Sequence, residues 1–129
     1  MKNGKVILVI DDEIGYRQLY QYLLEPLGYE VETAEDGSIG CEMALKKYYE
    51  MIFLDVHMPK MLGPEVLKRI KEQHPEQIII IFSSDSDSNR QFEEESMKLG
   101  AFDCLYKPVD LKDIVNVIER VNNYKSNGK

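Results

Sequence analysis

The segment MIFLDVHMP, from Met51 to Pro59, joins an apolar run to the carboxylate of Asp55. The run is too short for a typical helix and predicts a strand that is buried on both faces of a sheet. Asp55 would then lie at the carboxyl end of that strand, where open α/β sheets bind their ligands. A carboxylate in that position can act as a nucleophile or as a metal ligand.

Strands and helices alternate along the rest of the chain. Further strands are predicted at Val6–Ile10, Tyr29–Ala34, Ile78–Phe82 and Ala101–Tyr106. Helical spacing of apolar residues predicts helices from Tyr16 to Leu27 with a stop at Gly28, from Asp36 with the stripe Cys41, Ala44, Leu45 and Tyr48, from Gly63-Pro64 to Pro75, from about Arg90 to Leu99, and from Leu111 to Val121 after an Asp110 cap. The alternation predicts a flavodoxin-like α/β fold, a (βα)5 three-layer sandwich whose parallel five-stranded sheet has the order 2-1-3-4-5.

Length and composition predict one domain, residues 1–129, with a core from about residue 5 to 124 and a polar tail at 125–129. The net charge of −7 argues against nucleic acid as a direct ligand and is compatible with a bound cation. We expect no membrane segment and no signal peptide, since the apolar run from Val6 breaks at Asp11. Cys41 and Cys104 match no metal spacing. Because no export signal is expected, we expect a cytoplasmic location with both thiols reduced.

Three carboxylates are predicted to meet at one edge of the sheet. In the order 2-1-3-4-5 the first and third strands are neighbours, and their ends carry Asp11, Asp12 and Asp55. Like charges ~4 Å apart repel by about 4 kcal/mol per pair at an effective dielectric near 20. A raised pKa or a bound cation relieves that repulsion, and oxygen-only ligands suit Mg²⁺. An Asp-Asp pair alone is equally typical of a solvated turn, and it is Asp55 on the neighbouring strand that favours a metal site.

The same edge of the sheet should also hold a cation and a hydroxyl group. Lys107-Pro108 follows the fifth strand, and Ser83 and Ser84 follow the fourth. An ammonium and a hydroxyl can hold phosphoryl oxygens that a metal ion does not reach. Together with the acids they would stabilise an in-line phosphoryl transfer to Asp55.

The chain resembles the receiver domain of bacterial two-component response regulators, and in particular the single-domain, chemotaxis-regulator-like kind. The resemblance runs from about Val6 to Tyr124. The matching residues are Asp11-Asp12, Asp55 with Met58-Pro59 and Gly63, Ser83, and Lys107-Pro108. Each motif is weak alone, whereas their joint order and spacing is specific.

The resemblance implies a role for each matching residue. Asp55 would be the phospho-acceptor, and Ser83 and Lys107 would hold the phosphoryl oxygens, with the Lys107–Pro108 bond often cis in the family. The implied cofactor is Mg²⁺, bound directly by Asp12, Asp55 and the backbone carbonyl of His57, and through water by Asp11.

The implied function is that of a switch in phosphorelay signal transduction rather than of a classical enzyme. Asp55 would take its phosphoryl group from a sensor histidine kinase or a phosphotransfer protein in a Mg²⁺-dependent reaction. A downstream protein or an output domain would then bind the face made by the fourth helix, the fifth strand and the fifth helix. Nucleic acid and membrane are not expected as direct partners.

Two positions depart from the pattern of the family. The span from Ser83 to Lys107 is longer than is common, so Ser84 is an alternative to Ser83 as the switch hydroxyl. Cys104 stands where relatives usually carry an aromatic switch residue, between Phe102 and Tyr106. A different residue would then report the phosphorylation.

Several of these residues are compatible with more than one role. His57 either tunes the lifetime of the phosphate or is a half-exposed loop residue, and Glu93-Glu94-Glu95 is either a solvated helix face or part of a docking surface. A phosphohydrolase usually needs a second acid where His57 stands, and a flavodoxin phosphate loop would be repelled by Asp11-Asp12. A degenerate receiver is disfavoured by the intact acids and lysine. The stretch Asp85–Asn89 imitates a calcium loop but lacks its glycine and final glutamate.

Overall fold

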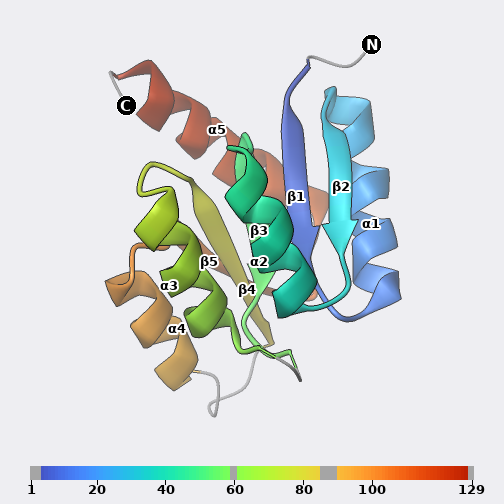
Figure 1. Cartoon of the computed structure of the whole chain (residues 1–129). Coiled ribbons are helices and arrows are strands. Elements are labelled where there is room, and N and C mark those ends of the chain that lie inside the picture. The colour runs from blue at the N-terminus through green and yellow to red at the C-terminus, as the bar shows by residue number, and fades with distance from the viewer. Residues whose placement is uncertain (1–3, 59–60, 85–89, 128–129) are drawn as a thin grey trace.

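The computed structural model describes residues 4–58, 61–84 and 90–127. Pro59 and the stretch 85–89 that imitates a calcium loop lie outside the described residues. One parallel sheet has the order β2-β1-β3-β4-β5 (Figure 1), which confirms the predicted fold class. Its strands are β1 (Val6–Ile10), β2 (Glu30–Ala34), β3 (Met51–Asp55), β4 (Ile79–Ser84) and β5 (Asp103–Lys107).

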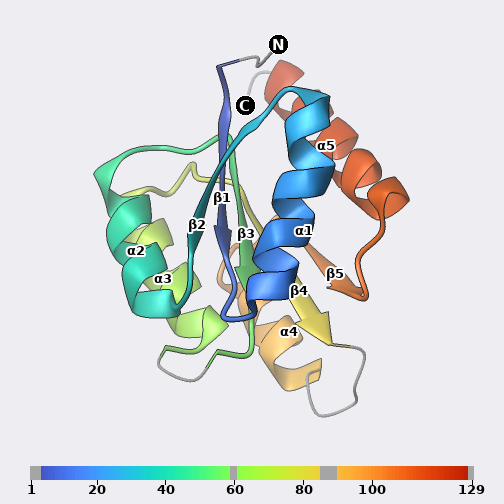
Figure 2. The ribbon, with the colours of Figure 1, turned by 90° about the vertical axis from the view of Figure 1, so that its right-hand side faces the viewer.

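Helices cover both faces of the sheet and complete a three-layer sandwich (Figure 2). They are α1 (Ile14–Leu24), the 3-10 turn η1 (Glu25–Leu27), α2 (Gly37–Lys46), α3 (Gly63–Gln73), α4 (Arg90–Lys98) and α5 (Leu111–Ser126). α1 and α5 pack on one face, and α2, α3 and α4 pack on the other. In the parts of the chain described, no helix is long and apolar enough to cross a membrane.

The central strand β3 is buried at all five positions, as its apolar sequence predicts. Successive side chains of a strand point to opposite faces of the sheet. Phe53 therefore packs with residues of α1 and α5, whereas Leu54 packs with residues of α2 and α3. Burying a side chain of this size stabilises the fold by about 1.5–3 kcal/mol. These contacts fix the end of β3, and with it the position of Asp55.

The first helix is shorter than its apolar spacing predicts. It ends at Leu24, and the 3-10 turn Glu25–Leu27 follows. Pro26 lacks the N–H that a further α-helical turn would need. Gly28 then ends the turn as predicted, with φ of 101°, a left-handed conformation that favours glycine.

The predicted apolar stripe of the second helix is only half correct. Cys41 and Ala44 are buried, whereas Leu45 and Tyr48 are exposed. The helix ends before Tyr48, whose ring stacks on that of His74 with 4.3 Å between the ring centroids.

The last helix is longer than predicted. α5 continues to Ser126, past the point where the polar tail was expected to begin. Lys125 explains the difference, because its Nζ donates to the backbone carbonyl of Glu50 at 2.8 Å and pairs with the Glu50 carboxylate at 3.2 Å.

Candidate functional site

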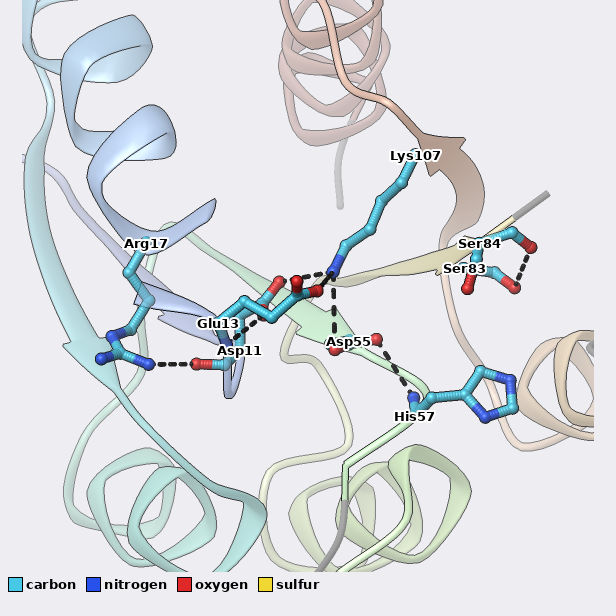
Figure 3. A network of polar contacts seen from close by, with 8 residues as sticks. All are labelled: Asp11, Glu13, Arg17, Asp55, His57, Ser83, Ser84 and Lys107. Atoms are coloured by element: carbon cyan, nitrogen blue, oxygen red, sulfur yellow. Dashed lines mark hydrogen bonds and ion pairs between the residues drawn. The ribbon is translucent and has the colours of Figure 1, made fainter. Parts of the chain in front are cut away.

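Three charged side chains meet at the carboxyl edge of the sheet (Figure 3). Asp11 directly follows β1, Asp55 is the last residue of β3, and Lys107 is the last residue of β5. Lys107 Nζ lies 2.9 Å from Asp11 Oδ2 and 3.5 Å from Asp55 Oδ2. The predicted pairing of β1 with β3 brings the two acids together, and β5 adds the cation from the far edge.

Backbone hydrogen bonds orient both buried carboxylates. Asp11 Oδ1 accepts from the N–H of Glu13 at 2.9 Å, and the Asp11 carbonyl accepts from Arg17 at 2.7 Å. Asp55 Oδ1 accepts from the N–H of His57 at 3.1 Å. In each acid Oδ1 is thus held by the main chain, while Oδ2 is directed toward Lys107 (Figure 3).

Four acidic residues form a cluster that is suited to a hard cation. Asp11, Asp12, Glu13 and Asp55 each offer a carboxylate oxygen, and these oxygens lie within 4.8 Å of one another. Asp12 and Glu13 are exposed to solvent, so the cluster is open on one side. Glu13, whose Oε1 lies 3.4 Å from Lys107 Nζ, was not predicted from the sequence to belong to this site. Its position directly after Asp11-Asp12 could have indicated a place in the cluster, but such a position is equally typical of a solvated helix start.

The pKa values at this site reflect burial opposed by ion pairing. Burial raises the pKa of Asp55 to about 7, with Lys107 lowering it and Asp11 raising it further. Burial also raises the pKa of Asp11. For Lys107, burial lowers the pKa, but the carboxylates of Asp11 and Asp55 outweigh burial and leave it raised. One lysine therefore does not fully compensate the acids, and a divalent cation with oxygen ligands, such as Mg²⁺, fits this donor set.

The two serines lie within β4 rather than in the following loop, because the strand extends to Ser84. Ser83 is fully buried, and its hydroxyl donates to the backbone carbonyl of Ser84 at 3.2 Å (Figure 3). Ser84 is exposed and pairs in register with Lys107 on β5. Both hydroxyls are therefore near the edge of the sheet that carries the acids.

The side chain of His57 is turned away from Asp55 (Figure 3). Its half-buried ring packs edge-on against Phe92 of α4, with 4.9 Å between the ring centroids. The backbone of His57, rather than its imidazole, contacts the carboxylate of Asp55.

The face made by α4, β5 and α5 carries polar bonds between its elements. The hydroxyl of Tyr106 donates to the carboxylate of Glu93, and Arg120 pairs with Asp103. Glu93 thus forms a solvent-exposed hydrogen bond that links α4 to β5. Cys104 is half-buried, and burial raises the pKa of its thiol to about 12.

An aromatic ring contacts the lysine of the site. Lys107 Nζ lies 4.0 Å from the centroid of the Tyr16 ring. Helical spacing places Tyr16 correctly on the buried side of α1, but no pattern in the sequence indicates that Lys107 approaches it. The Lys107–Pro108 bond itself is cis, as the resemblance implied.

Comparison with known proteins gives a consistent result. The family model of the response regulator receiver domain matches residues 7–119. The transcriptional regulatory protein CpxR homolog of Haemophilus influenzae is 33% identical over 115 residues, which cover 89% of this chain and 49% of that protein. ZraR of Escherichia coli, also a transcriptional regulatory protein, is 32% identical over 114 residues, which cover 88% of this chain and 25% of that protein. The chain thus spans about half the length of the first relative and a quarter of the second.

Solved structures agree with the sequence comparisons. A response regulator receiver domain protein from Clostridium thermocellum superposes with a TM-score of 0.85 and is 34% identical, covering 95% of this chain and 97% of that one. The chemotaxis protein CheY4 of Vibrio cholerae gives a TM-score of 0.80 and 31% identity, covering 91% of this chain and 98% of that one. Both likenesses extend over nearly the whole chain.

Proposed function

This chain belongs to the response regulator receiver domain family of two-component systems, and on that premise we propose that Asp55 accepts a phosphoryl group from a sensor histidine kinase or a phosphotransfer protein. One observation carries the proposal. The carboxylate of Asp55 is buried at the end of β3, within 3.5 Å of the Lys107 ammonium and inside a cluster of acids. Asp55 lies at the end of the central strand β3, with one oxygen held by the His57 N–H and the other directed toward the cation.

The proposed cofactor is Mg²⁺. Asp12, Asp55 and the backbone carbonyl of His57 would hold it directly, and Asp11 would do so through water. When bound, the ion supplies positive charge to the acids and to the oxygens of the incoming phosphoryl group. The close approach of the carboxylate oxygens supports this assignment.

In the proposed transfer, an oxygen of ionised Asp55 forms a bond to phosphorus while the bond between phosphorus and the donor imidazole nitrogen breaks. The leaving nitrogen keeps the electron pair of that bond. The N–H of His57 holds one oxygen of Asp55 in place. Lys107 and Ser83, with Ser84 as the alternative hydroxyl, would bind the phosphoryl oxygens as negative charge spreads over them.

The proposed outcome is a switch rather than turnover of a substrate. The phosphoryl group adds charge and hydrogen-bond acceptors at Asp55. The hydroxyl of Ser83, which now donates to the Ser84 carbonyl, would turn toward them and shift an existing equilibrium between two conformations. The face of α4, β5 and α5 would then bind a downstream protein or an output domain.

The partners and the extent of the domain are also part of the proposal. Two relatives are named transcriptional regulatory proteins and are at least twice as long as the aligned part, which supports an output domain in those proteins. For this chain we propose one receiver domain over residues 1–129, with its core at about 5–124, acting in the cytoplasm. Neither nucleic acid nor membrane is proposed as its direct ligand.

A phosphorylation assay tests the function. Wild type and Asp55→Asn are incubated with acetyl phosphate and Mg²⁺, and intact mass and amide NMR spectra are recorded. Wild type should gain the mass of one phosphoryl group and show shifts at Ser83 and along β5, whereas Asp55→Asn should show neither. Asp113→Asn, an exposed acid in the first turn of α5, is the matched control and should behave as wild type. A folded wild type that gains no mass, or an Asp55→Asn variant that gains it, contradicts the proposal.

A further inference from the structure

Lys107 has two different kinds of neighbour. On one side lie carboxylates, with Asp11 Oδ2 at 2.9 Å, the exposed Glu13 Oε1 at 3.4 Å and Asp55 Oδ2 at 3.5 Å from Nζ. The other neighbour is the half-buried ring of Tyr16, whose centroid lies 4.0 Å from the same nitrogen. An ammonium within about 6 Å of an aromatic centroid is attracted by the electron-rich face of the ring.

The Tyr16 ring is fixed by the core beneath the site. Its centroid lies 6.1 Å from that of Tyr20, which is 1% exposed. Tyr20 in turn packs edge-on against Phe53 and Phe82, with centroid distances of 5.5 and 5.2 Å. Phe53 precedes Asp55 by two positions on β3, and Phe82 directly precedes the switch serine on β4. The same aromatic contacts therefore anchor both the ring and the strands that carry the site.

The two kinds of neighbour differ in what happens when the site is loaded. Asp11 and Asp55 are also the proposed ligands of Mg²⁺, so the ion competes with Lys107 for their oxygens. The Tyr16 ring does not bind Mg²⁺, because an aromatic face is a poor ligand for that ion. Its contact with Lys107 is therefore not lost when the metal binds. Its attraction for an ammonium is also less directional than a carboxylate hydrogen bond. The ring can therefore keep Lys107 beside Asp55 while the carboxylates change partners.

We infer that Tyr16 is a positioning residue for the proposed phosphoryl transfer, its ring face holding the Lys107 ammonium where the phosphoryl oxygens arrive. The inference rests on the proposed function. It assigns to Tyr16 a task beyond packing, which a leucine of similar size would not perform.

The test compares the initial rate of phosphorylation by acetyl phosphate, at saturating Mg²⁺, in three variants. Tyr16→Leu keeps an apolar side chain but removes the ring, and should lower the rate about fivefold, the effect of losing one partly buried cation–π contact. Tyr16→Phe keeps the ring and should stay within about twofold of wild type. Tyr22→Leu on the same helix, at a position that is 77% exposed, controls for loss of a tyrosine from α1. Urea unfolding of each variant shows that all are folded under the conditions of the assay.

A double-mutant cycle separates positioning from structural support. In a Lys107→Met background, Tyr16→Leu should have no further effect on the rate, because the ring acts through the lysine. A purely structural role would lower the rate in both backgrounds. Equal rates for Tyr16→Leu and Tyr16→Phe, or a full effect of Tyr16→Leu without Lys107, overturn the inference.

Ring-current shifts give a readout that does not depend on phosphorylation. The Cε protons of Lys107 should be shifted upfield in wild type and Tyr16→Phe, and should return to ordinary values in Tyr16→Leu. If wild type takes up no phosphoryl group, the proposed function fails, and the inference fails with it even where the shift is present. If wild type is phosphorylated and the three variants match it, the inference about Tyr16 alone fails.

Discussion

Lys107 and Asp11 form a buried ion pair across the edge of the sheet. Lys107 Nζ lies 2.9 Å from Asp11 Oδ2, and 9% and 1% of the two side chains are exposed. The pair joins the end of β5 to the end of β1, which are separated in the sheet by β3 and β4. Before any phosphoryl group arrives, Lys107 thus already compensates part of the negative charge of the acids on which the proposed chemistry depends.

Removing the charge of Lys107 should destabilise the protein. Breaking a buried pair costs about 3–5 kcal/mol, and since these acids can take up protons or open to solvent, we expect Lys107→Met to lose about 2 kcal/mol near neutral pH. The loss should shrink near pH 5, where the acids are more protonated. Urea unfolding in the absence of divalent ions measures it. Lys112→Met, an exposed lysine of α5, is the control, and an equal loss in both variants would exclude a special role for the buried pair.

Asp55→Asn should stabilise the metal-free protein, increasingly so as the pH rises. The pKa of Asp55 is raised to about 7 in the folded protein, against about 3.9 when unfolded. Between these values the folded state binds more protons, so this group contributes less stability as the pH rises from about 4 to about 7. Asparagine does not titrate, and its advantage should reach at most about 4 kcal/mol above that range. Urea unfolding near pH 5 and pH 8 tests this, and an advantage that stays constant with pH would refute it.

Mg²⁺ should stabilise wild type and have much less effect on Asp12→Asn. An ion that binds only the folded protein adds about 1.4 kcal/mol at ten times its dissociation constant. The added stability should appear as a rise in the midpoint of thermal unfolding. Asp113→Asn should gain as much as wild type. Equal gains in Asp12→Asn and wild type would place the ion outside the acidic cluster.

Two glycines should respond in opposite ways to replacement by alanine. A Cβ at Gly63 would lie 2.6 Å from the Cα of Val56, the residue that directly follows Asp55. Gly63→Ala should therefore cost about 2–3 kcal/mol and displace the loop that follows β3. At Gly15 in α1, a Cβ would have no atom of the described residues within 4 Å, and Gly15→Ala should be neutral or gain up to about 1 kcal/mol. Chemical denaturation of both variants checks the pair, and similar losses in both would contradict the steric argument.

The sequence was sufficient for the architecture because its signals are local. The unbroken apolar run before Asp55 requires a strand with both faces covered, and the alternation of strands and helices then restricts the order of the sheet. The same strand order predicts that Asp11, Asp55 and Lys107 lie at the carboxyl edge of the sheet, and their ion pairs confirm it. The predictions were wrong at the helix ends. The first helix ends in a 3-10 turn that contains Pro26, and Tyr48 lies beyond the end of the second helix, where its ring stacks on His74.

The contacts that sequence patterns could not predict are those between distant residues. Tyr16 and Lys107 are far apart in the sequence, and they meet because α1 starts at the carboxyl end of the sheet, where β5 ends. Glu13 joins the cluster through the turn that starts α1, and its sequence context does not distinguish this from a solvated position. Side-chain direction, as at His57, depends on which helix packs nearby.

Among the residues that the structure describes, the sheet divides the interior into two cores with no side chain in common. Phe53 belongs to one and Leu54 to the other, although they are adjacent in the chain. Changes in volume within one core are therefore absorbed by its own helices, and substitutions on opposite sides of the sheet should combine additively. Evolution can in this way remodel the core that carries α4 while leaving intact the aromatic contacts beneath Asp55, the proposed acceptor. A domain built in this manner can change the surface that α4 contributes without altering the ring contacts that support the end of β3.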